Sequence, residues 1–158
     1  GFTGVRLGWC VVPMELVVQG TAKGEVNSVW NRRQTTMFNG ASNIAQEGGL
    51  AVLTEQGQME CGLIINYYME NARIILEGLQ RLGLNVFGGV NAPYIWVKTQ
   101  NRMSSWDFFE VLLEGAHVVC TPGVGFGRLG EGYVRLSAFG HRENVLQAVE
   151  SITRNVRI

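Results

Sequence analysis

The sequence has little of several features that mark other classes of protein. Its 13 basic and 13 acidic residues balance, so no net charge attracts the chain to nucleic acid or to an anionic membrane. The three cysteines, Cys10, Cys61 and Cys120, lack the spacing of metal ligands, which predicts reduced thiols and no bound metal. Apolar runs are too short to span a membrane, and only three prolines interrupt the chain.

Glycine is abundant instead, with 21 residues, many of them in clusters. The first nine residues, GFTGVRLGW, have no initiator methionine and no polar lead-in, so we expect the natural chain to extend further upstream. Residues 5–12 are apolar apart from Arg6 and stop at Pro13. This pattern predicts a strand buried on both faces that holds one functional or paired cation.

Hydrophobic periodicity predicts a helical first part of the chain. One helix is expected over residues 25–37 and a second over 41–53, although the glycine pair at 48–49 weakens the second. The longest periodic pattern covers residues 54–82 and stops at Gly83, a residue suited to a left-handed helix end. We expect the boundary between two parts of the chain to lie within this long helix.

After Gly83 the pattern is strand, strand, helix, strand, strand, helix, which predicts a small α/β layer. Ser104 and Asp107 have the spacing of a capping box at the start of the first of these helices. The expected elements are strands at 85–89, 94–97, 117–120 and 133–137, a helix from Ser104 closed by Gly115, and a last helix from His141 to Val156.

Two arginines are candidates for binding an anion. Arg6 lies between Gly4 and Gly8, where the backbone can approach a ligand closely, and its planar fork fits a phosphate or a carboxylate. The alternative for Arg6 is a structural pair with a carboxylate. The period of a strand places Arg135 on one face with Tyr133 and Ser137, beside a glycine-rich loop. The alternative for Arg135 is a solvated arginine of an edge strand.

Other polar positions are less informative. Asn39 lies in the corner FNGAS between two helices, where it would either cap a helix or reach for a ligand. The loop at 123–127 lacks the GxGxxG spacing and precedes a strand, which argues against dinucleotide binding. His117 and His141 have no nearby nucleophile and no metal-ligand spacing.

Five segments form a more specific set: GFTGVRLGW at 1–9, FNGASNI at 38–44, NAPYIWV at 91–97, TPGVGFG at 121–127 and GEGYVRLSAFGHRE at 130–143. In this order they closely resemble the C-terminal part of the LL-diaminopimelate aminotransferases, which are fold-type I, pyridoxal-phosphate-dependent transaminases. The resemblance runs over essentially the whole chain. It implies an α/β fold in which residues 1–57 end the large cofactor-binding domain, 58–82 form an interdomain helix and 83–158 form the small C-terminal domain.

The resemblance also implies roles for three residues. Arg6 is expected to bind the phosphate of pyridoxal 5'-phosphate, and Arg135 to hold the α-carboxylate of the substrate. Asn39 is expected to reach across a homodimer interface toward cofactor and substrate in the partner subunit. The Schiff-base lysine of that family lies a few residues before the GFTGVR segment. No catalytic residue is therefore assigned within this chain, which we expect to be inactive alone.

The implied reaction converts LL-diaminopimelate and 2-oxoglutarate to tetrahydrodipicolinate and glutamate, and its reverse serves lysine biosynthesis. The resemblance implies small amino-acid and 2-oxo-acid substrates, no nucleic acid or membrane partner, and a cytoplasmic location, or the plastid stroma in a plant or alga. Two alternatives stay open. One is another fold-type I aminotransferase acting on aspartate or aromatic amino acids, and the other is a non-catalytic, incomplete domain.

Overall fold

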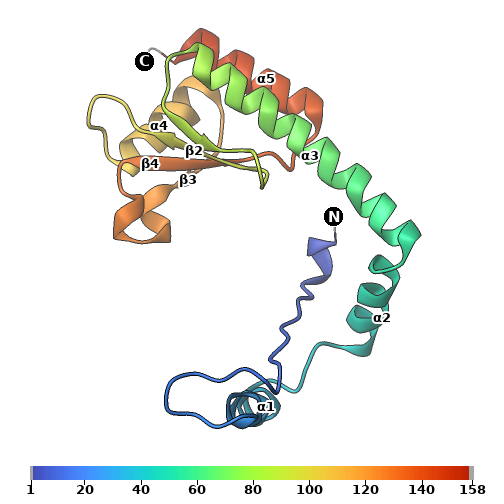
Figure 1. The fold of residues 1–158 in the computed structure, drawn as a ribbon. Coiled ribbons are helices and arrows are strands. Elements are labelled where there is room, and N and C mark those ends of the chain that lie inside the picture. The colour runs from blue at the N-terminus through green and yellow to red at the C-terminus, as the bar shows by residue number, and fades with distance from the viewer. Residues whose placement is uncertain (1, 157–158) are drawn as a thin grey trace. The chain divides into compact units, whose positions relative to one another are not determined.

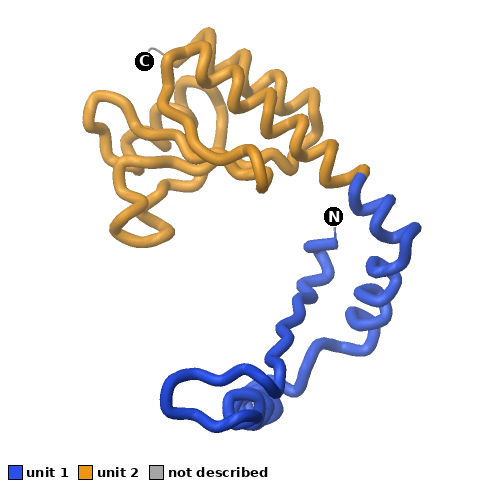
Figure 2. The backbone as a smooth tube through the Cα atoms, viewed as in Figure 1, with its two compact units in different colours: residues 1–62 blue, residues 63–158 orange. Residues whose placement is uncertain are grey.

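The computed structural model describes residues 2–156, and the chain forms two compact units, residues 1–62 and 63–158 (Figure 2). The division falls within the longest helix, α3 (Glu55–Arg81), which confirms the helix predicted over 54–82. The assignment of 1–57 to a large domain, 58–82 to an interdomain helix and 83–158 to a small domain stays a prediction.

The first unit contains the helices α1 (Glu25–Met37) and α2 (Asn43–Val52), close to their predicted bounds. The strand expected over residues 5–12 is wrong. After a short 3-10 turn, η1 (Thr3–Val5), the chain has no regular structure up to Pro13. A strand is held by hydrogen bonds to a neighbouring strand, and the described part of this unit contains none.

The glycine pair inside α2 has a packing reason. A Cβ atom on Gly48 would lie 2.7 Å from Cζ of Phe2, and one on Gly49 would overlap the Leu7 side chain. The bare helix surface at these positions lets the N-terminal segment lie directly against α2. Tertiary contact therefore overrides the low helix propensity of glycine at this place.

The second unit contains a four-stranded antiparallel sheet with the order β1-β2-β4-β3 (Figure 1). Its strands are β1 (Val86–Gly88), β2 (Tyr94–Lys98), β3 (Thr121–Pro122) and β4 (Tyr133–Ser137). Three of the four predicted strands are confirmed. The strand expected at 117–120 is wrong, because the chain pairs with β4 only at Thr121 and Pro122.

Two further helices belong to this unit, α4 (Ser105–Ala116) and α5 (Arg142–Asn155). The capping box before α4 is confirmed, since Ser104 and Asp107 each bond the other's backbone N–H. The predicted helix end at Gly115 is wrong. The residue in the left-handed conformation at the end of α4 is His117, with φ 58°. The next strand, β3, begins only at Thr121.

The core of the second unit lies between one face of the sheet and α3, α4 and α5. Along β2 and β4 the buried and less buried side chains alternate, with Ile95, Val97 and Val134 at most 1% exposed. Burial of one such aliphatic side chain stabilises the fold by about 1.5–3 kcal/mol. The other face of the sheet consequently presents a different set of side chains: Tyr94, Trp96, Tyr133, Arg135 and Ser137.

The architecture of helices over a small antiparallel sheet agrees with the predicted fold class. None of the helices in the described residues combines the length and the apolar character that a membrane crossing requires.

Candidate functional site

Arg6 lies in the first unit, in a backbone conformation that is unusual for a residue other than glycine. Its φ is 60°, in the left-handed region, and its backbone N–H donates to the carbonyl oxygen of Thr3 at 3.2 Å. Its Nη1 atom lies 3.5 Å from the same oxygen. The expected alternative, a pair with a structural carboxylate, is not seen among residues 2–156.

A hollow of about 790 Å³ lies beside Arg6 in the first unit. Its walls come from the segment that follows Arg6, from α1 and from α2, and most of their side chains are apolar, among them Trp9 and Trp30. Arg6 is the one charged residue that lines it within the described chain. A concave, largely apolar surface with a single cation suits an organic anion. The donor set fits a phosphate group.

Asn39 lies in the exposed corner between α1 and α2. The cap of α2 is Ser42, whose hydroxyl accepts from the Ala45 N–H at 3.3 Å, so the helix-capping alternative does not apply to Asn39. The neighbouring residues Phe38 and Gly40 line the hollow beside Arg6. The structure thus brings the FNGAS corner and Arg6 to one place in this unit. The role of Asn39 in a partner subunit stays a prediction.

Arg135 lies in the second unit, at the centre of β4. As predicted, it shares a face with Tyr133 and Ser137, and it is half-buried, which differs from the alternative of a solvated edge arginine. β4 is an interior strand of the sheet, since Arg135 is paired with Trp96 on one side and with Thr121 on the other.

Two aromatic rings enclose the guanidinium of Arg135. Its Cζ atom lies 4.4 Å from the centre of the Tyr94 ring and 4.2 Å from that of Phe126. Within residues 2–156 the guanidinium makes no hydrogen bond and no ion pair. Sequence reasoning did not find either ring. The face of β2 that carries Tyr94 follows from strand alternation once the pairing of β2 with β4 is known.

Phe126 ends a short turn of 3-10 helix, η2 (Gly123–Phe126), within the region predicted as a glycine-rich loop. This loop is anchored to the start of α4. The Ser105 hydroxyl donates to the Gly130 carbonyl oxygen at 3.3 Å and accepts from the Gly132 N–H at 3.1 Å. The Ser105 N–H in turn donates to a carboxylate oxygen of Glu131 at 2.8 Å. Ser105 itself is fully buried, and the three hydrogen bonds are partly buried.

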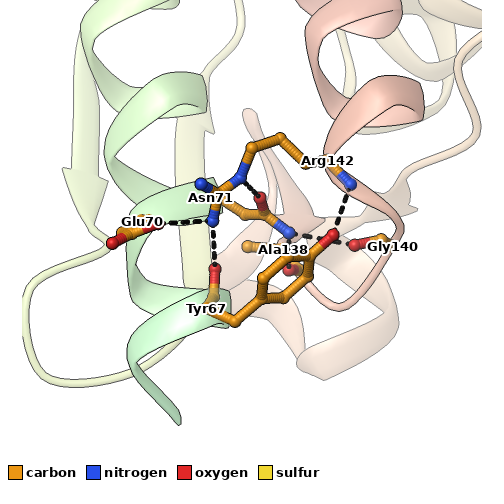
Figure 3. A network of polar contacts seen from close by, with 6 residues as sticks. All are labelled: Tyr67, Glu70, Asn71, Ala138, Gly140 and Arg142. Carbon is orange, nitrogen blue, oxygen red and sulfur yellow. Dashed lines mark hydrogen bonds and ion pairs between the residues drawn. The ribbon is translucent and has the colours of Figure 1, made fainter. Parts of the chain in front are cut away.

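The segment after β4 is held by a second polar network (Figure 3). The Arg142 guanidinium forms an ion pair of 2.6 Å with Glu70, and its Nε donates to Oδ1 of Asn71 at 3.1 Å. The Arg142 backbone N–H donates to the hydroxyl of Tyr67 at 2.7 Å. These bonds join the SAFGHRE motif to α3. Their geometry makes them structural supports of the strand that carries Arg135.

The remaining reactive groups do not form a site. Burial raises the pKa of the Cys120 thiol to about 12, which keeps it protonated at neutral pH. Across residues 2–156 no group of three or more His, Cys, Asp or Glu side chains could hold a metal ion.

The family model for aminotransferase class I and II matches residues 1–152. The chain belongs to this family. It is 56% identical to the LL-diaminopimelate aminotransferase of Bacteroides fragilis (strain YCH46) over 155 residues, which are 96% of the chain and 38% of that protein. The family resemblance seen in the sequence motifs is thereby confirmed.

Solved structures give the same result. An LL-diaminopimelate aminotransferase from Chlamydomonas reinhardtii matches with a TM-score of 0.87 and 50% identity, over 96% of this chain and 36% of that one. A tetra mutant of Thermus thermophilus aspartate aminotransferase matches with a TM-score of 0.71 and 29% identity, over 84% and 37%. The chain thus spans less than two fifths of the length of these relatives. The fold-type I architecture of its matches confirms the predicted fold.

Proposed function

We propose that the whole protein is a pyridoxal-phosphate-dependent transaminase that interconverts LL-diaminopimelate and 2-oxoglutarate with tetrahydrodipicolinate and glutamate. The observation that carries the proposal is Arg135, whose guanidinium is enclosed by two rings and has no acceptor within residues 2–156. Such a cation suits the α-carboxylate that amino acids and 2-oxo acids share. The choice of amino acid is supported by the names of two relatives that are 50% and 56% identical to this chain.

Pyridoxal phosphate, when bound, supplies the electron sink that transamination requires. In this chain, Arg6 would hold its phosphate. The guanidinium fork can donate two parallel hydrogen bonds to phosphate oxygens, and the hollow beside it offers no competing carboxylate among the described residues.

Arg135 would hold the substrate by its α-carboxylate and thereby fix the direction of the bonds at Cα. Orientation of this kind lowers the barrier because the reacting bond is aligned before the reaction begins. The amino acid and the 2-oxo acid carry the same carboxylate, so one arginine serves both halves of the exchange.

A homodimer in which Asn39 reaches the partner's site is part of the same proposal. Members of this family use amino and oxo acids and act as dimers. Sedimentation of the whole protein tests the dimer, and the activity of an Asn39→Ala variant tests the role of Asn39. A wild-type monomer with full activity contradicts this part of the proposal.

One assay tests the reaction itself. LL-diaminopimelate, meso-diaminopimelate, aspartate and phenylalanine are each supplied with 2-oxoglutarate to the whole protein with pyridoxal phosphate, and glutamate is measured. We expect the highest kcat/KM with LL-diaminopimelate. A preference for aspartate or phenylalanine indicates another aminotransferase of this fold, and no glutamate from any of them indicates a non-catalytic protein.

Substitution of Arg135 tests the residue that carries the proposal. We expect Arg135→Ala to lower kcat/KM, with a loss of transition-state stabilisation of about 2–5 kcal/mol, because the carboxylate loses its charged partner. Lys98→Ala is the matched control, since Lys98 is an exposed cation on the neighbouring strand β2. Equal kinetics of the Arg135→Ala variant and the wild type would remove Arg135 from the site.

A further inference from the structure

The two rings beside Arg135 leave one part of the guanidinium open. A guanidinium is planar, and its five N–H donors point outward within that plane. The Cζ atom of Arg135 lies over the rings of Tyr94 and Phe126, at 4.4 and 4.2 Å from the ring centres, which is within the range of a cation–π contact. Neither contact uses a hydrogen-bond acceptor, and the guanidinium has no hydrogen bond or ion pair within residues 2–156, so its N–H donors stay available.

Each of these rings is held by another ring. Phe126 contacts Trp96 edge-to-face with 5.3 Å between ring centres, and Tyr94 contacts Phe139 in the same manner at 5.4 Å. Phe139 in turn contacts Tyr68 of α3 at 5.0 Å. Edge-to-face pairs at such distances are favourable beyond their burial. The enclosure is thus built into the fold without a ligand.

Packing against the core does not account for Phe126. Its side chain is 50% exposed, although the loop that carries it is anchored to the buried Ser105. The hydroxyl of Tyr94 makes no hydrogen bond within residues 2–156, so the ring is the part of this side chain that acts on Arg135. What both residues share is contact with the guanidinium.

We propose that Tyr94 and Phe126 are positioning residues, which hold the Arg135 guanidinium edge-on so that it binds the substrate carboxylate through two parallel hydrogen bonds. This inference rests on the proposed function of Arg135. A free arginine side chain samples many rotamers, and an arginine that is already fixed loses less conformational entropy when it binds. Removal of one ring should therefore weaken carboxylate binding and leave the chemical step less affected.

The test compares KM and kcat in the whole protein loaded with pyridoxal phosphate. For Phe126→Leu and Tyr94→Leu we expect the apparent KM of the amino acid and that of 2-oxoglutarate to rise by about tenfold each, with kcat within about threefold of wild type. Tyr94→Phe retains the ring and should stay within about twofold in both parameters. Phe87→Leu is the matched control, because Phe87 is an exposed ring of the same sheet that contacts Tyr133.

An Arg135→Met background separates positioning from general support of the fold. If the rings act through Arg135, adding Phe126→Leu to Arg135→Met changes KM by less than about twofold, because the coupled group is already absent. A further tenfold rise in that background overturns the proposal, as does an unchanged KM in both leucine variants. If Phe126→Leu does not fold, as judged by its cofactor absorbance and unfolding midpoint, the Tyr94→Leu and Tyr94→Phe pair gives the same comparison.

This experiment can fail separately from the proposed reaction. If another α-amino acid proves to be the preferred substrate, the same KM comparison is made with that amino acid, since it carries the same carboxylate. An unchanged KM in Arg135→Met would contradict the role of Arg135 and this inference together. If Arg135→Met raises KM but Phe126→Leu and Tyr94→Leu do not, only this inference is contradicted.

Discussion

The buried side-chain amide of Asn71 donates a hydrogen bond of 2.9 Å to the backbone carbonyl oxygen of Gly140, 69 residues further along the chain. It donates a second one, of 3.2 Å, to Ala138, and its Oδ1 accepts from Arg142. One side chain of α3 thus satisfies two carbonyl groups in the turn between β4 and α5 (Figure 3). Because this turn directly follows the strand of Arg135, the network sets where that strand ends.

Asn71→Leu should strongly destabilise this unit. The buried carbonyl group of Ala138 and the partly buried carbonyl group of Gly140 would lose their donor, and an unsatisfied buried group costs about 1–3 kcal/mol. We expect the free energy of unfolding, measured by urea denaturation, to fall by about 2–4 kcal/mol. Asn144→Leu is the control at an exposed position of α5 and should change it by less than about 0.5 kcal/mol. Similar values for the two variants would show that the network is not a major support.

Arg142 and Glu70 should differ in importance although they form one ion pair. The pair is partly solvent-exposed, at 34% and 54% of the two side chains, so Glu70→Gln should cost less than about 1 kcal/mol. Arg142→Met also removes the bond to Asn71 and the contact with the Tyr67 ring, where Cζ lies 4.7 Å from the ring centre. We expect a loss of about 1–3 kcal/mol from this change, measured in the same denaturation experiment. A larger loss from Glu70→Gln contradicts this ranking.

Cys120 should be far less reactive than an exposed cysteine. Burial raises its thiol pKa from 9.0 to about 12, which lowers the thiolate population at pH 8 by about a thousandfold. Iodoacetamide at pH 8 should therefore modify the exposed Cys10 first, as read by mass spectrometry of peptides. In urea the two thiols should react at similar rates.

The same pKa shift has a consequence for stability. Because the folded state favours the neutral thiol, its contribution to stability is present below the unfolded pKa of 9.0. It declines as the pH rises from there toward 12. Cys120→Ser should remove this part of the alkaline pH dependence, and an unchanged alkaline slope would contradict the shift.

Local patterns predicted the elements whose burial is periodic. The helix α1 and the strand β4 agree with their predicted bounds, and α3 differs by one residue at each end. Each of them carries its signal in residues spaced by one helical turn or by two along a strand. The capping box before α4 was equally local, because both of its members lie within one turn.

Failures of prediction came from long-range contacts. Residues 5–12 have the composition of a strand, but composition does not supply a partner for the hydrogen bonds. The left-handed turn at His117 depends on the end of α4 and not on the nearest glycine. The rings around Arg135 come from β2 and from a separate loop, so only the sheet register brings them to it.

The loop that carries Phe126 should depend on one glycine and tolerate the loss of another. A Cβ atom on Gly123 would overlap the carbonyl oxygen of Gly130 and lie 2.6 Å from that of Tyr133. Both obstacles are backbone atoms, so the loop has to shift. Gly123→Ala should therefore reduce the free energy of unfolding by about 2 kcal/mol or more.

The kinetic consequence follows from the position of Phe126 at the end of the same turn. Displacement of its ring should raise the apparent KM of the whole protein for the amino acid and for 2-oxoglutarate together. Gly125→Ala is the matched control, because no atom lies within 4 Å of its added Cβ, and it should change stability by less than about 0.5 kcal/mol. If Gly123→Ala is as stable as Gly125→Ala and its KM values are normal, the close approach of the Gly123 and Gly130 backbones does not set the position of Phe126.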